Sequence, residues 1–414
     1  MKLIYNIQYN HTPIGVCFQV FFYNKWHTNA TKGGAMMATG VICEFNPFHN
    51  GHKYLLQKAK QLTNEPVIAI MSGSFTQRGE VAITDKFART KSALQNGADL
   101  VLELPTAYAV ANAQKFAECG TFIANSFSCV NHLAFGCETD NTNQLITAAG
   151  SIDNTDVQKK INEKMQNGDY YPRAFESAVR EVLSSDIADI LTTPNNILAV
   201  EYIRSLSGSK VLPLPIKRIG TAHDSTTPNG TIASASHIRT LARNGKDFSN
   251  FMPCSLEQMT FPENLENAML YKLRSMTADD FAQLPDVNEG LENRILDAVK
   301  NCSTVDEIIS TIKTKRYTHA RIRRIITCAV LGITKDLQQT PIEFVRVLGF
   351  TESGASLLKT CTLNVVTSAS DGIKLGKNTE KLLTKDIFAT DISSLAYPVP
   401  KQCGLDFTTP IIKL

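Results

Sequence analysis

Residues 39–55 read TGVICEFNPFHNGHKYL, and this stretch decides the fold of the chain. Its first part is a run of small and β-branched apolar residues up to Glu44, which is typical of a strand buried on both faces of a parallel sheet. An Asn-Pro pair interrupts the run, and apolar residues then recur at helical spacing. The stretch therefore predicts a buried strand, a turn and a helix with Asn50 as its N-cap.

Two histidines flank Gly51 at the predicted N-terminus of this helix. Unpaired backbone N–H groups and the helix dipole make such a terminus an anion site, and a glycine lets a phosphate approach the backbone. His49 and His52 can face a bound phosphate and stabilise charge that develops on it. A His-x-Gly-His tetrapeptide also occurs as ordinary polar surface, so the motif alone leaves both interpretations open.

Strands and helices alternate after this unit. Strands are predicted at residues 67–71, 99–105, 132–136 and 211–219, and helices at residues 84–97, 111–126 and across 143–206. This alternation predicts an α/β fold, a Rossmann-like domain with a parallel sheet. Ligands bind at the carboxyl ends of the strands in such sheets, so we expect these ends to converge on one crevice. The ends are Glu44 and residues 72–80, 103–105 and 136–138.

A second motif begins the last predicted helix of this domain, where residues 234–239 read SASHIR. The hydroxyls of Ser234 and Ser236, nearby backbone N–H groups and the Arg239 guanidinium can form one phosphate-sized pocket. A serine N-cap followed by a solvated arginine explains the same residues. Taken alone, this motif therefore does not decide between a phosphate pocket and an ordinary helix start.

The length of 414 residues exceeds the usual size of one hydrophobic core, so two domains are expected. We place an α/β domain at residues 36–245 and a mainly α-helical domain at residues 246–414. Residues 1–35 show neither helical nor alternating periodicity, and two methionines directly precede the first strand. We therefore expect residues 1–35 to be a non-native or upstream N-terminal extension.

The composition is that of a globular protein without a strong charge. Lys and Arg exceed Asp and Glu by three, which neither requires nor excludes a nucleic acid partner. Ten cysteines are scattered without a Cys-x-x-Cys pair, which indicates reduced core residues rather than zinc ligands or disulfides. The apolar run near the N-terminus is too short for a signal peptide or a membrane span. We expect a cytoplasmic protein that binds neither a membrane nor DNA.

The pairing of the two motifs is far more specific than either motif alone. A His-x-Gly-His turn after the first strand and a Ser-x-Ser-x-x-Arg helix start after the last strand resemble the HIGH superfamily of nucleotidyltransferases. Four segments closely resemble the tRNA(Met) cytidine acetate ligase family: EFNPFHNGH (44–52), MSGSFTQRGE (71–80), FGCE (135–138) and NNIL (195–198). The similarity covers residues 37–239 and continues more weakly through residues 315–333 and the C-terminal tail.

The resemblance implies an ATP-dependent ligase that activates acetate as acetyl-adenylate and releases pyrophosphate. The acetyl group then passes to the wobble cytidine of elongator tRNA(Met), which yields N4-acetylcytidine and AMP. The implied partners are therefore acetate and the anticodon region of that tRNA. ATP is the co-substrate, and Mg²⁺ is expected with it.

The resemblance also implies which residues bind ATP. The matching strand-to-helix segment comprises Ile42, Cys43, Glu44, Phe45, Asn46, Pro47, Phe48, His49, Asn50, Gly51, His52, Lys53, Tyr54 and Leu55. Further implied contacts are Gly136, Arg218 and Asn195, with Asn196 as the alternative register. Cys137 and Ala199 depart from the family, in which serine and glycine respectively are common at the matching positions.

The chemistry of adenylate formation assigns roles to these groups. Attack on the α-phosphorus builds negative charge, so fixed positive donors are needed rather than a strong base. We assign this catalytic role to His49, His52 and Arg239. Residues expected to hold the phosphates are Arg218, Ser234 and Ser236. A Mg²⁺ would bridge the phosphates, although the sequence shows no dedicated carboxylate cage for it.

Other polar residues have less support. Lys86 and Arg89 are expected on the solvated surface of a helix, and Arg78 in a glycine-flanked loop is expected to contact substrate or RNA. For Glu44, contact with a metal ion and hydrogen bonds to backbone N–H groups remain equally open. Three aspartates are possible proton acceptors for the cytidine amine, without a motif to support them: Asp99, Asp140 and Asp224.

The strongest basic cluster lies at residues 313–324, which read KTKRYTHARIRR. A solvated amphipathic helix is the usual explanation of such a run. An RNA substrate, however, needs phosphate contacts that this nearly neutral chain does not otherwise provide. We predict tRNA binding by Arg78, Lys315, Arg316, Arg321 and Arg324.

Two other classes of function share some of these features. An adenylyltransferase acting on a small molecule would carry both motifs, and the basic C-terminal helices argue against it. A noncatalytic RNA-binding protein with a relic nucleotide pocket is the second alternative. The intact His49, His52 and Arg239 argue against that reading.

Overall fold

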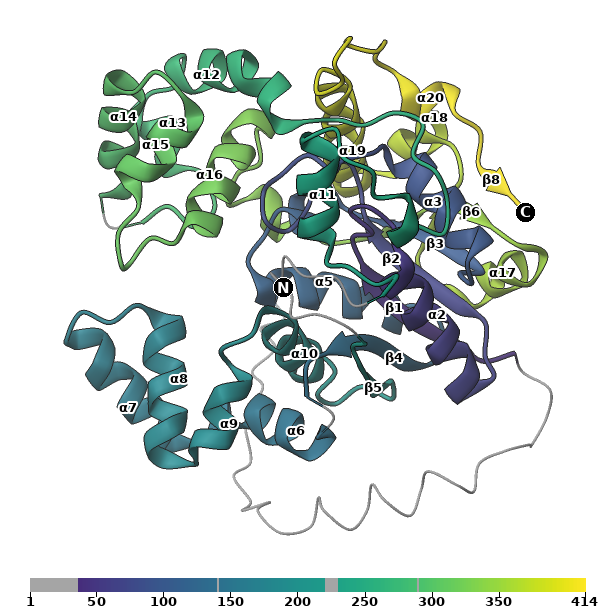
Figure 1. Cartoon of the computed structure of the whole chain (residues 1–414), viewed down its shortest axis with the longest axis horizontal. Coiled ribbons are helices and arrows are strands. Elements are labelled where there is room, and N and C mark those ends of the chain that lie inside the picture. Colours follow the sequence, from purple (N-terminus) through teal and green to yellow (C-terminus); the bar gives the residue numbers. More distant parts are fainter. Residues whose placement is uncertain (1–35, 140, 220–229, 289) are drawn as a thin grey trace, which may run out of the picture. The chain divides into compact units, whose positions relative to one another are not determined.

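An eight-stranded, mainly parallel sheet forms the centre of this computed structural model, which describes residues 36–139, 141–219, 230–288 and 290–414 (Figure 1). The strand order is β5-β4-β1-β2-β3-β6-β7, and β8 pairs with β6. The strands are β1 (Ala38–Cys43), β2 (Val67–Ser72), β3 (Leu100–Leu104), β4 (Val130–Cys137), β5 (Leu212–Lys217), β6 (Phe344–Phe350), β7 (Asn364–Val366) and β8 (Ile412–Lys413). Strands β1 to β5 pair in parallel, which confirms the predicted Rossmann-like α/β fold.

Helices connect the strands and pack on the sheet (Figure 1). Before β5 they are α2 (Asn50–Thr63), α3 (Lys86–Gln95), α4 (Thr106–Ala109), α5 (Ala113–Asn125), α6 (Thr142–Gly150), α7 (Thr155–Gln166), α8 (Tyr171–Val182), α9 (Ser185–Ile190) and α10 (Pro194–Ser205). After β5 they are α11 (Ala235–Arg243), α12 (Glu266–Arg274), α13 (Ala278–Ala282), α14 (Leu291–Asn301), α15 (Val305–Ile312), α16 (His319–Leu331), α17 (Glu352–Leu357), α18 (Ala369–Gly372), α19 (Lys377–Ser394) and α20 (Leu405–Thr408). Short 3₁₀ turns are η1 (Ser151–Asp153), η2 (Ser249–Phe251), η3 (Pro262–Leu265), η4 (Leu337–Gln339), η5 (Leu358–Thr360) and η6 (Ile373–Leu375).

Strand β1 lies in the interior of the sheet, between β2 and β4. Every residue of β1 is buried. Ile42 belongs to the hydrophobic core on one face of the sheet, and Val41 and Cys43 belong to a second core. Burial on both faces explains why the sequence of β1 is continuously apolar. Parallel pairing brings the carboxyl ends of β1 to β5 to the same edge of the sheet.

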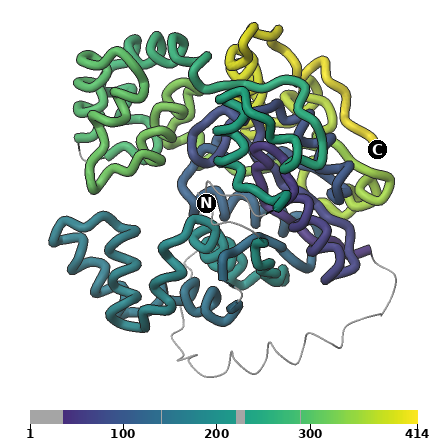
Figure 2. The backbone as a smooth tube through the Cα atoms, viewed as in Figure 1, coloured from purple at the N-terminus to yellow at the C-terminus, as the bar shows by residue number. Residues whose placement is uncertain are grey.

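The C-terminal part of the chain adds strands that the sequence analysis did not predict (Figure 2). Strand β6 pairs antiparallel with β3, and the short strands β7 and β8 pair with β6. β7 and β8 have three and two residues, too few for a periodic pattern. Residues 37–414 form one compact unit, and the domain boundary at residue 245 stays a prediction. The extension predicted at residues 1–35 lies outside the described residues.

Lys86 and Arg89 are both buried in α3, so the prediction that they lie on a solvated surface is wrong. The Arg89 guanidinium donates to the backbone carbonyls of Glu44 at 2.7 Å and Ser72 at 3.0 Å, and also to Gly73. These carbonyls lie at or just beyond the carboxyl ends of β1 and β2. A buried carbonyl needs a hydrogen-bond partner, and one guanidinium supplies several donors.

The Lys86 ammonium belongs to a buried cluster of charges. Its Nζ lies 2.7 Å from Glu103 Oε1 and 2.8 Å from Asp406 Oδ1. Arg346 of β6 places Nη2 2.8 Å from the same Asp406 oxygen. Burial, and then the charge of Glu103, raise the pKa of Asp386 to about 8. The cluster therefore joins α3 and β3 to the C-terminal elements β6, α19 and α20. Buried charges are stable only when they are paired.

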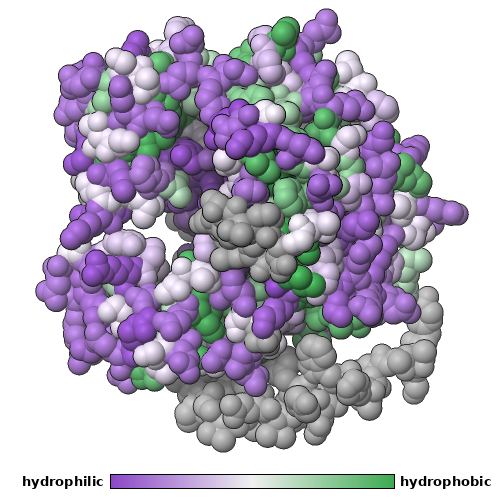
Figure 3. Space-filling view, in the orientation of Figure 1, coloured by the Kyte–Doolittle hydropathy of each residue, from purple (hydrophilic) through white to green (hydrophobic). Residues whose placement is uncertain are grey.

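The surface drawn in Figure 3 is mostly hydrophilic over α7, α8 and α12 to α16. Across the part of the chain that the structure describes, none of the helices has both the length and the apolar character that a membrane crossing would require.

The nine cysteines among the described residues all carry free thiols, and most of them are buried. The expected core placement is confirmed for the five buried ones, Cys43, Cys119, Cys129, Cys137 and Cys328, whereas Cys403 is exposed.

Candidate functional site

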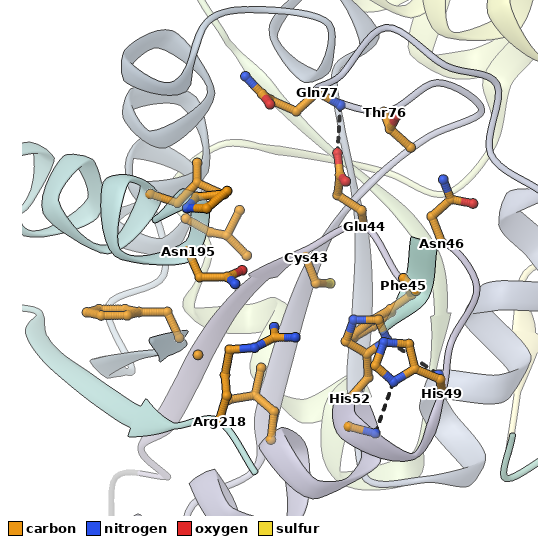
Figure 4. A pocket seen from close by; sticks show the side chains of 18 of the residues that line it. Cys43, Glu44, Phe45, Asn46, His49, His52, Thr76, Gln77, Asn195 and Arg218 are labelled. Carbon is orange, nitrogen blue, oxygen red and sulfur yellow. Dashed lines mark hydrogen bonds between the residues drawn. The ribbon is translucent and has the colours of Figure 1, made fainter. Parts of the chain in front are cut away.

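A cavity of about 500 Å³ lies at the carboxyl ends of β1, β4 and β5, beside the N-termini of α2, α10 and α11 (Figure 4). Most of the residues predicted to bind ATP or to act in catalysis line it. They are Ile42, Cys43, Glu44, Phe45, Asn46, His49, Gly51, His52, Tyr54, Leu55, Gly136, Asn195, Arg218, Ser236 and Arg239. Arg78, which was predicted to contact tRNA, lines it as well. Both motifs thus border one cavity.

Six of the assigned residues do not line the cavity: Pro47, Phe48, Asn50, Lys53, Asn196 and Ser234. Phe48 is buried, and its ring lies 4.8 Å from the ring of Phe45. Asn50 donates through Nδ2 to the carbonyls of Thr231 at 2.8 Å and Asn250 at 3.0 Å. Phe48 and Asn50 therefore support the turn from outside the cavity.

His49, rather than the predicted Asn50, is the N-cap of α2. Its Nδ1 accepts the backbone N–H of Gly51 at 3.0 Å. In return, Nδ1 of His52 accepts the backbone N–H of His49 at 3.4 Å, which completes a capping box. Asparagine is a preferred N-cap residue and histidine is not, so the sequence pointed to Asn50 instead of His49.

These hydrogen bonds determine the protonation state of both imidazoles. A ring nitrogen that accepts a hydrogen bond carries no proton, so the N–H of each ring is on Nε2. Burial, and then the charges of Arg218 and Arg239, lower the pKa of His49 to about 3. Burial and the neighbouring His49 lower the pKa of His52 well below its ordinary value. The two rings, with centroids 3.8 Å apart, are therefore neutral N–H donors.

Arg239 connects the two motifs directly. Its Nη1 donates to the backbone carbonyl of Asn46 at 2.8 Å, across a separation of 193 residues. Its Nη2 donates to Ser236 Oγ at 3.3 Å. Ser234 is the N-cap of α11 and accepts the backbone N–H of His237 at 3.1 Å. The guanidinium thus lies between the turn after β1 and the start of α11.

The ends of β4 and β5 form another wall. A Cβ atom at Gly136 would lie 3.3 Å from Cγ of Arg218, so the glycine makes room for the arginine stem. Asn195 Nδ2 donates to Glu138 Oε1 at 2.5 Å, while Asn196 Oδ1 accepts the backbone N–H of Glu138 at 2.8 Å. Asn195 lines the cavity, whereas Asn196 does not and holds the chain behind it. Of the two asparagines that the resemblance offered for ATP contact, Asn195 is therefore the one at the cavity.

An apolar part of the wall was not assigned from the sequence. It consists of Phe116 of α5, Phe135 of β4, and Ile197, Leu198 and Tyr202 of α10. The rings of Phe135 and Tyr202 lie 5.5 Å apart. Ile197 and Leu198 stand in the quoted NNIL segment, which was the available signal, but an apolar residue by itself does not distinguish a pocket wall from core. A surface of this kind suits a flat heterocyclic ring.

The charged residues that line the cavity are Arg78, Lys217, Arg218, Arg239, Glu44 and Glu80. Cations therefore exceed carboxylates among the described lining residues. Burial lowers the pKa of Arg218 and Arg239, and nearby carboxylates oppose this shift. Fixed cations together with two neutral N–H donors at a helix N-terminus suit a polyphosphate.

Helix α16 borders the cavity through Ala320. The loop after β2 docks on this helix, where Arg323 pairs with Glu80 and Thr327 Oγ1 donates to the carbonyl of Gly79 at 2.7 Å. Gly79 has φ 75°, and a Cβ atom there would lie 2.8 Å from the backbone of Arg323. The close approach of loop and helix therefore requires glycine.

The charged side chains of the basic cluster, in α16 and the preceding turn, do not line the cavity. Lys315 and Arg316 are exposed. Arg321 donates through Nη2 to the carbonyl of Asp286 at 2.7 Å, and Arg324 donates to the Asp286 carboxylate at 3.3 Å. Two of the predicted tRNA contacts therefore also hold α16 against the segment before α14.

Comparison with known proteins shows the family. The model of the HIGH nucleotidyl transferase family matches residues 36–405. The tRNA(Met) cytidine acetate ligase of Thermoanaerobacter sp. (strain X514) is 39% identical over 400 residues, which cover 91% of this chain and 99% of that protein. The tRNA(Met) cytidine acetate ligase of Clostridium kluyveri is 38% identical over 391 residues, which cover 87% of this chain and 95% of that protein.

Solved structures agree. The apo crystal structure of Thermotoga maritima TmcAL is 30% identical, with a TM-score of 0.86, and covers 92% of this chain and 100% of that one. The structure of the same protein bound with alpha-thio ATP has a TM-score of 0.84 at the same identity and coverage. The chain therefore belongs to the HIGH nucleotidyl transferase family and, within it, to the tRNA(Met) cytidine acetate ligases.

Proposed function

We propose that this protein is an ATP-dependent ligase that activates acetate as acetyl-adenylate and transfers the acetyl group to the wobble cytidine of elongator tRNA(Met). The observation that carries the proposal is the hydrogen bond from Arg239 to the carbonyl of Asn46, because it joins the two motifs at one cavity. The related tRNA(Met) cytidine acetate ligases, and the ATP-analogue complex of TmcAL, support the same reaction.

In this proposal the base of ATP lies against the apolar wall and the triphosphate lies against the N-terminus of α2. The Nε2–H groups of His49 and His52 and the guanidiniums of Arg218 and Arg239 then face the phosphates. Charge that builds on the α-phosphate and on the departing pyrophosphate meets donors that are already in place. No proton has to leave a histidine, which agrees with the low pKa of both rings.

Mg²⁺ is proposed as a companion of the triphosphate rather than an ion held by the protein. Across the described residues, no group of three or more His, Cys, Asp and Glu side chains is placed to hold a metal ion. The side chains therefore do not form a cage, and phosphate oxygens and water are the ligands that Mg²⁺ would take here.

The tRNA is proposed to approach along α16, which borders the cavity and carries the basic cluster. Exposed Lys315 and Arg316 are suited to phosphate contacts, and Arg78 lies in the cavity wall where an extruded cytidine would enter. Arg321 and Arg324 are proposed to bind phosphate as well, although both already contact Asp286. The free thiols suit a cytoplasmic protein.

The two rival functions make different predictions for one experiment, the exchange of labelled pyrophosphate into ATP with tRNA(Met) present. The ligase is expected to exchange label only when acetate is added. An adenylyltransferase acting on a small molecule would not respond to acetate, and a noncatalytic RNA-binding protein would exchange nothing. Absence of acetate-dependent exchange would contradict the proposal.

A further inference from the structure

Glu44 presents a carboxylate to the cavity from the end of β1 (Figure 4). Its Oε1 accepts the backbone N–H of Gln77 at 2.6 Å. Within the part of the chain that the structure describes, Oε2 receives no hydrogen bond. One oxygen thus holds the carboxyl group in place, while the other is available to a molecule in the cavity.

The other polar groups of the cavity are poorly suited to accept a proton. His49 and His52 carry their protons on Nε2, because Nδ1 of each ring accepts a backbone N–H. Glu80, the second carboxylate among the described lining residues, is paired with Arg323. The remaining charged lining residues are cations.

The three aspartates considered from the sequence do not replace Glu44. Asp99 lies before β3, at the opposite end of the sheet, where Oδ2 accepts the backbone N–H of Val67 at 2.8 Å and lies 2.7 Å from Lys60 Nζ. It does not line the cavity. Asp140 and Asp224 lie outside the described residues.

We propose that Glu44 is the catalytic base of acetyl transfer, an inference that rests on the function proposed above. The exocyclic nitrogen of cytidine forms a bond to the acetyl carbonyl carbon with its lone pair. The bond between that carbon and the phosphate oxygen breaks, and its electron pair leaves with AMP. The proton that the nitrogen loses passes to Oε2 of Glu44 and from there to solvent after product release.

The surroundings of Glu44 suit this role. Burial raises the pKa of its carboxyl group, and the charges of Arg239, Arg78 and Arg89 oppose the shift. A base is more effective as its pKa approaches the working pH, provided that it stays ionised. Three cations on three different segments favour the ionised form.

Two neutral groups that line the cavity feel the charge of this carboxylate. Burial and the charge of Glu44 raise the pKa of Tyr202 far above its ordinary value. Burial raises the pKa of the Cys43 thiol, whose Sγ donates to the carbonyl of Ile70 at 3.7 Å. Both groups remain protonated near neutral pH, so neither competes with Glu44 for the proton.

The variant Glu44→Gln tests the proposal, because its amide oxygen can still accept the Gln77 N–H but cannot take a proton. In single-turnover experiments with preformed acetyl-adenylate, transfer to tRNA should slow by about 10²- to 10⁴-fold, while acetate-dependent pyrophosphate exchange falls by less than about tenfold. The wild-type transfer rate should rise with pH through the pKa of Glu44, and that rise should be absent in the variant. Glu44→Asp keeps a carboxylate and should recover part of the rate.

The matched control is Glu65→Gln. This glutamate lies just before β2 and next to the start of β1, at the end of the sheet opposite to the cavity. Glu65 Oε2 accepts the hydroxyl of Thr39 at 2.7 Å and does not line the cavity. If Glu44→Gln transfers the acetyl group at the wild-type rate, the proposal is overturned. The departing phosphate of AMP would then be the group that accepts the proton. Equal loss of exchange and transfer would also overturn the proposal, since that pattern indicates a structural role. If the proposed function itself is wrong, the wild-type protein will show no acetate-dependent exchange. That result distinguishes failure of the function from failure of the role proposed for Glu44.

Discussion

Replacing His49 by asparagine separates two tasks that one imidazole combines. Asparagine is among the preferred N-cap residues, and its Oδ1 can accept the Gly51 N–H that His49 Nδ1 accepts at 3.0 Å. Its Nδ2–H₂ group is a donor, but the shorter side chain does not reach the position of the imidazole Nε2–H. His49→Asn therefore keeps the cap of α2 and removes one donor from the cavity, whereas His49→Ala removes both.

The two tasks have different energetic sizes. Removing one preorganised donor from a developing oxyanion costs about 10²- to 10³-fold in rate, or about 2.7–4 kcal/mol. Removing an N-cap costs about 1 kcal/mol of stability. We expect both variants to lose adenylation to this extent. Only His49→Ala should also lose about 1 kcal/mol in the free energy of unfolding.

Acetate-dependent exchange of labelled pyrophosphate into ATP measures the first effect, and urea unfolding followed by circular dichroism measures the second. His237→Asn is the matched control, because it makes the same change in a histidine that does not line the cavity. Wild-type exchange by His49→Asn would refute the assigned donor role. A stability loss equal to that of His49→Ala would refute the capping argument.

Three further predictions follow from the same geometry. Folding lowers the pKa of His49 to about 3, from an ordinary 6.5. Below pH 6.5 the unfolded chain therefore binds more protons than the folded chain. The free energy of unfolding should fall by about 1.4 kcal/mol per pH unit from pH 6.5 toward pH 3. Urea unfolding at pH 7.5 and 5.5 checks this, and an equal loss in His49→Asn would contradict it. Gly79→Ala should cost about 2–4 kcal/mol from positive-φ strain and contact with the α16 backbone, and an unchanged melting temperature would count against it. Lys315→Ala with Arg316→Ala should weaken tRNA binding and flatten its salt dependence without changing ATP affinity, as filter binding at several salt concentrations would reveal; unaltered tRNA affinity would remove these residues from the interface.

The strand-turn-helix unit at residues 39–55 could be predicted because its signals are local. A continuously apolar strand, an Asn-Pro turn and a helical period each leave a mark within a few residues. The pairing of this unit with residues 234–239 could be predicted from the resemblance to the HIGH superfamily, which combines both motifs. In the structure, the hydrogen bond from Arg239 to the carbonyl of Asn46 joins the two motifs.

Features that depend on distant partners could not be predicted. Lys86 and Arg89 have the spacing of surface residues, and only the folded sheet shows the buried acceptors that they satisfy. Strand β6 joins the sheet because β3 has an open edge, which no local pattern indicates. The apolar wall formed by Phe116 and Tyr202 likewise exists only after α5 and α10 meet the end of β4.

The central claim is that this cavity makes acetyl-adenylate for transfer to a tRNA base. The most direct measurement is mass analysis of the nucleosides of unmodified tRNA(Met) after incubation with the protein, ATP and isotopically labelled acetate. We predict labelled N4-acetylcytidine at the wobble position, dependent on ATP and strongly reduced by His49→Asn. Unmodified cytidine with wild-type protein, or labelled acetylcytidine formed equally well by His49→Asn, would contradict the account.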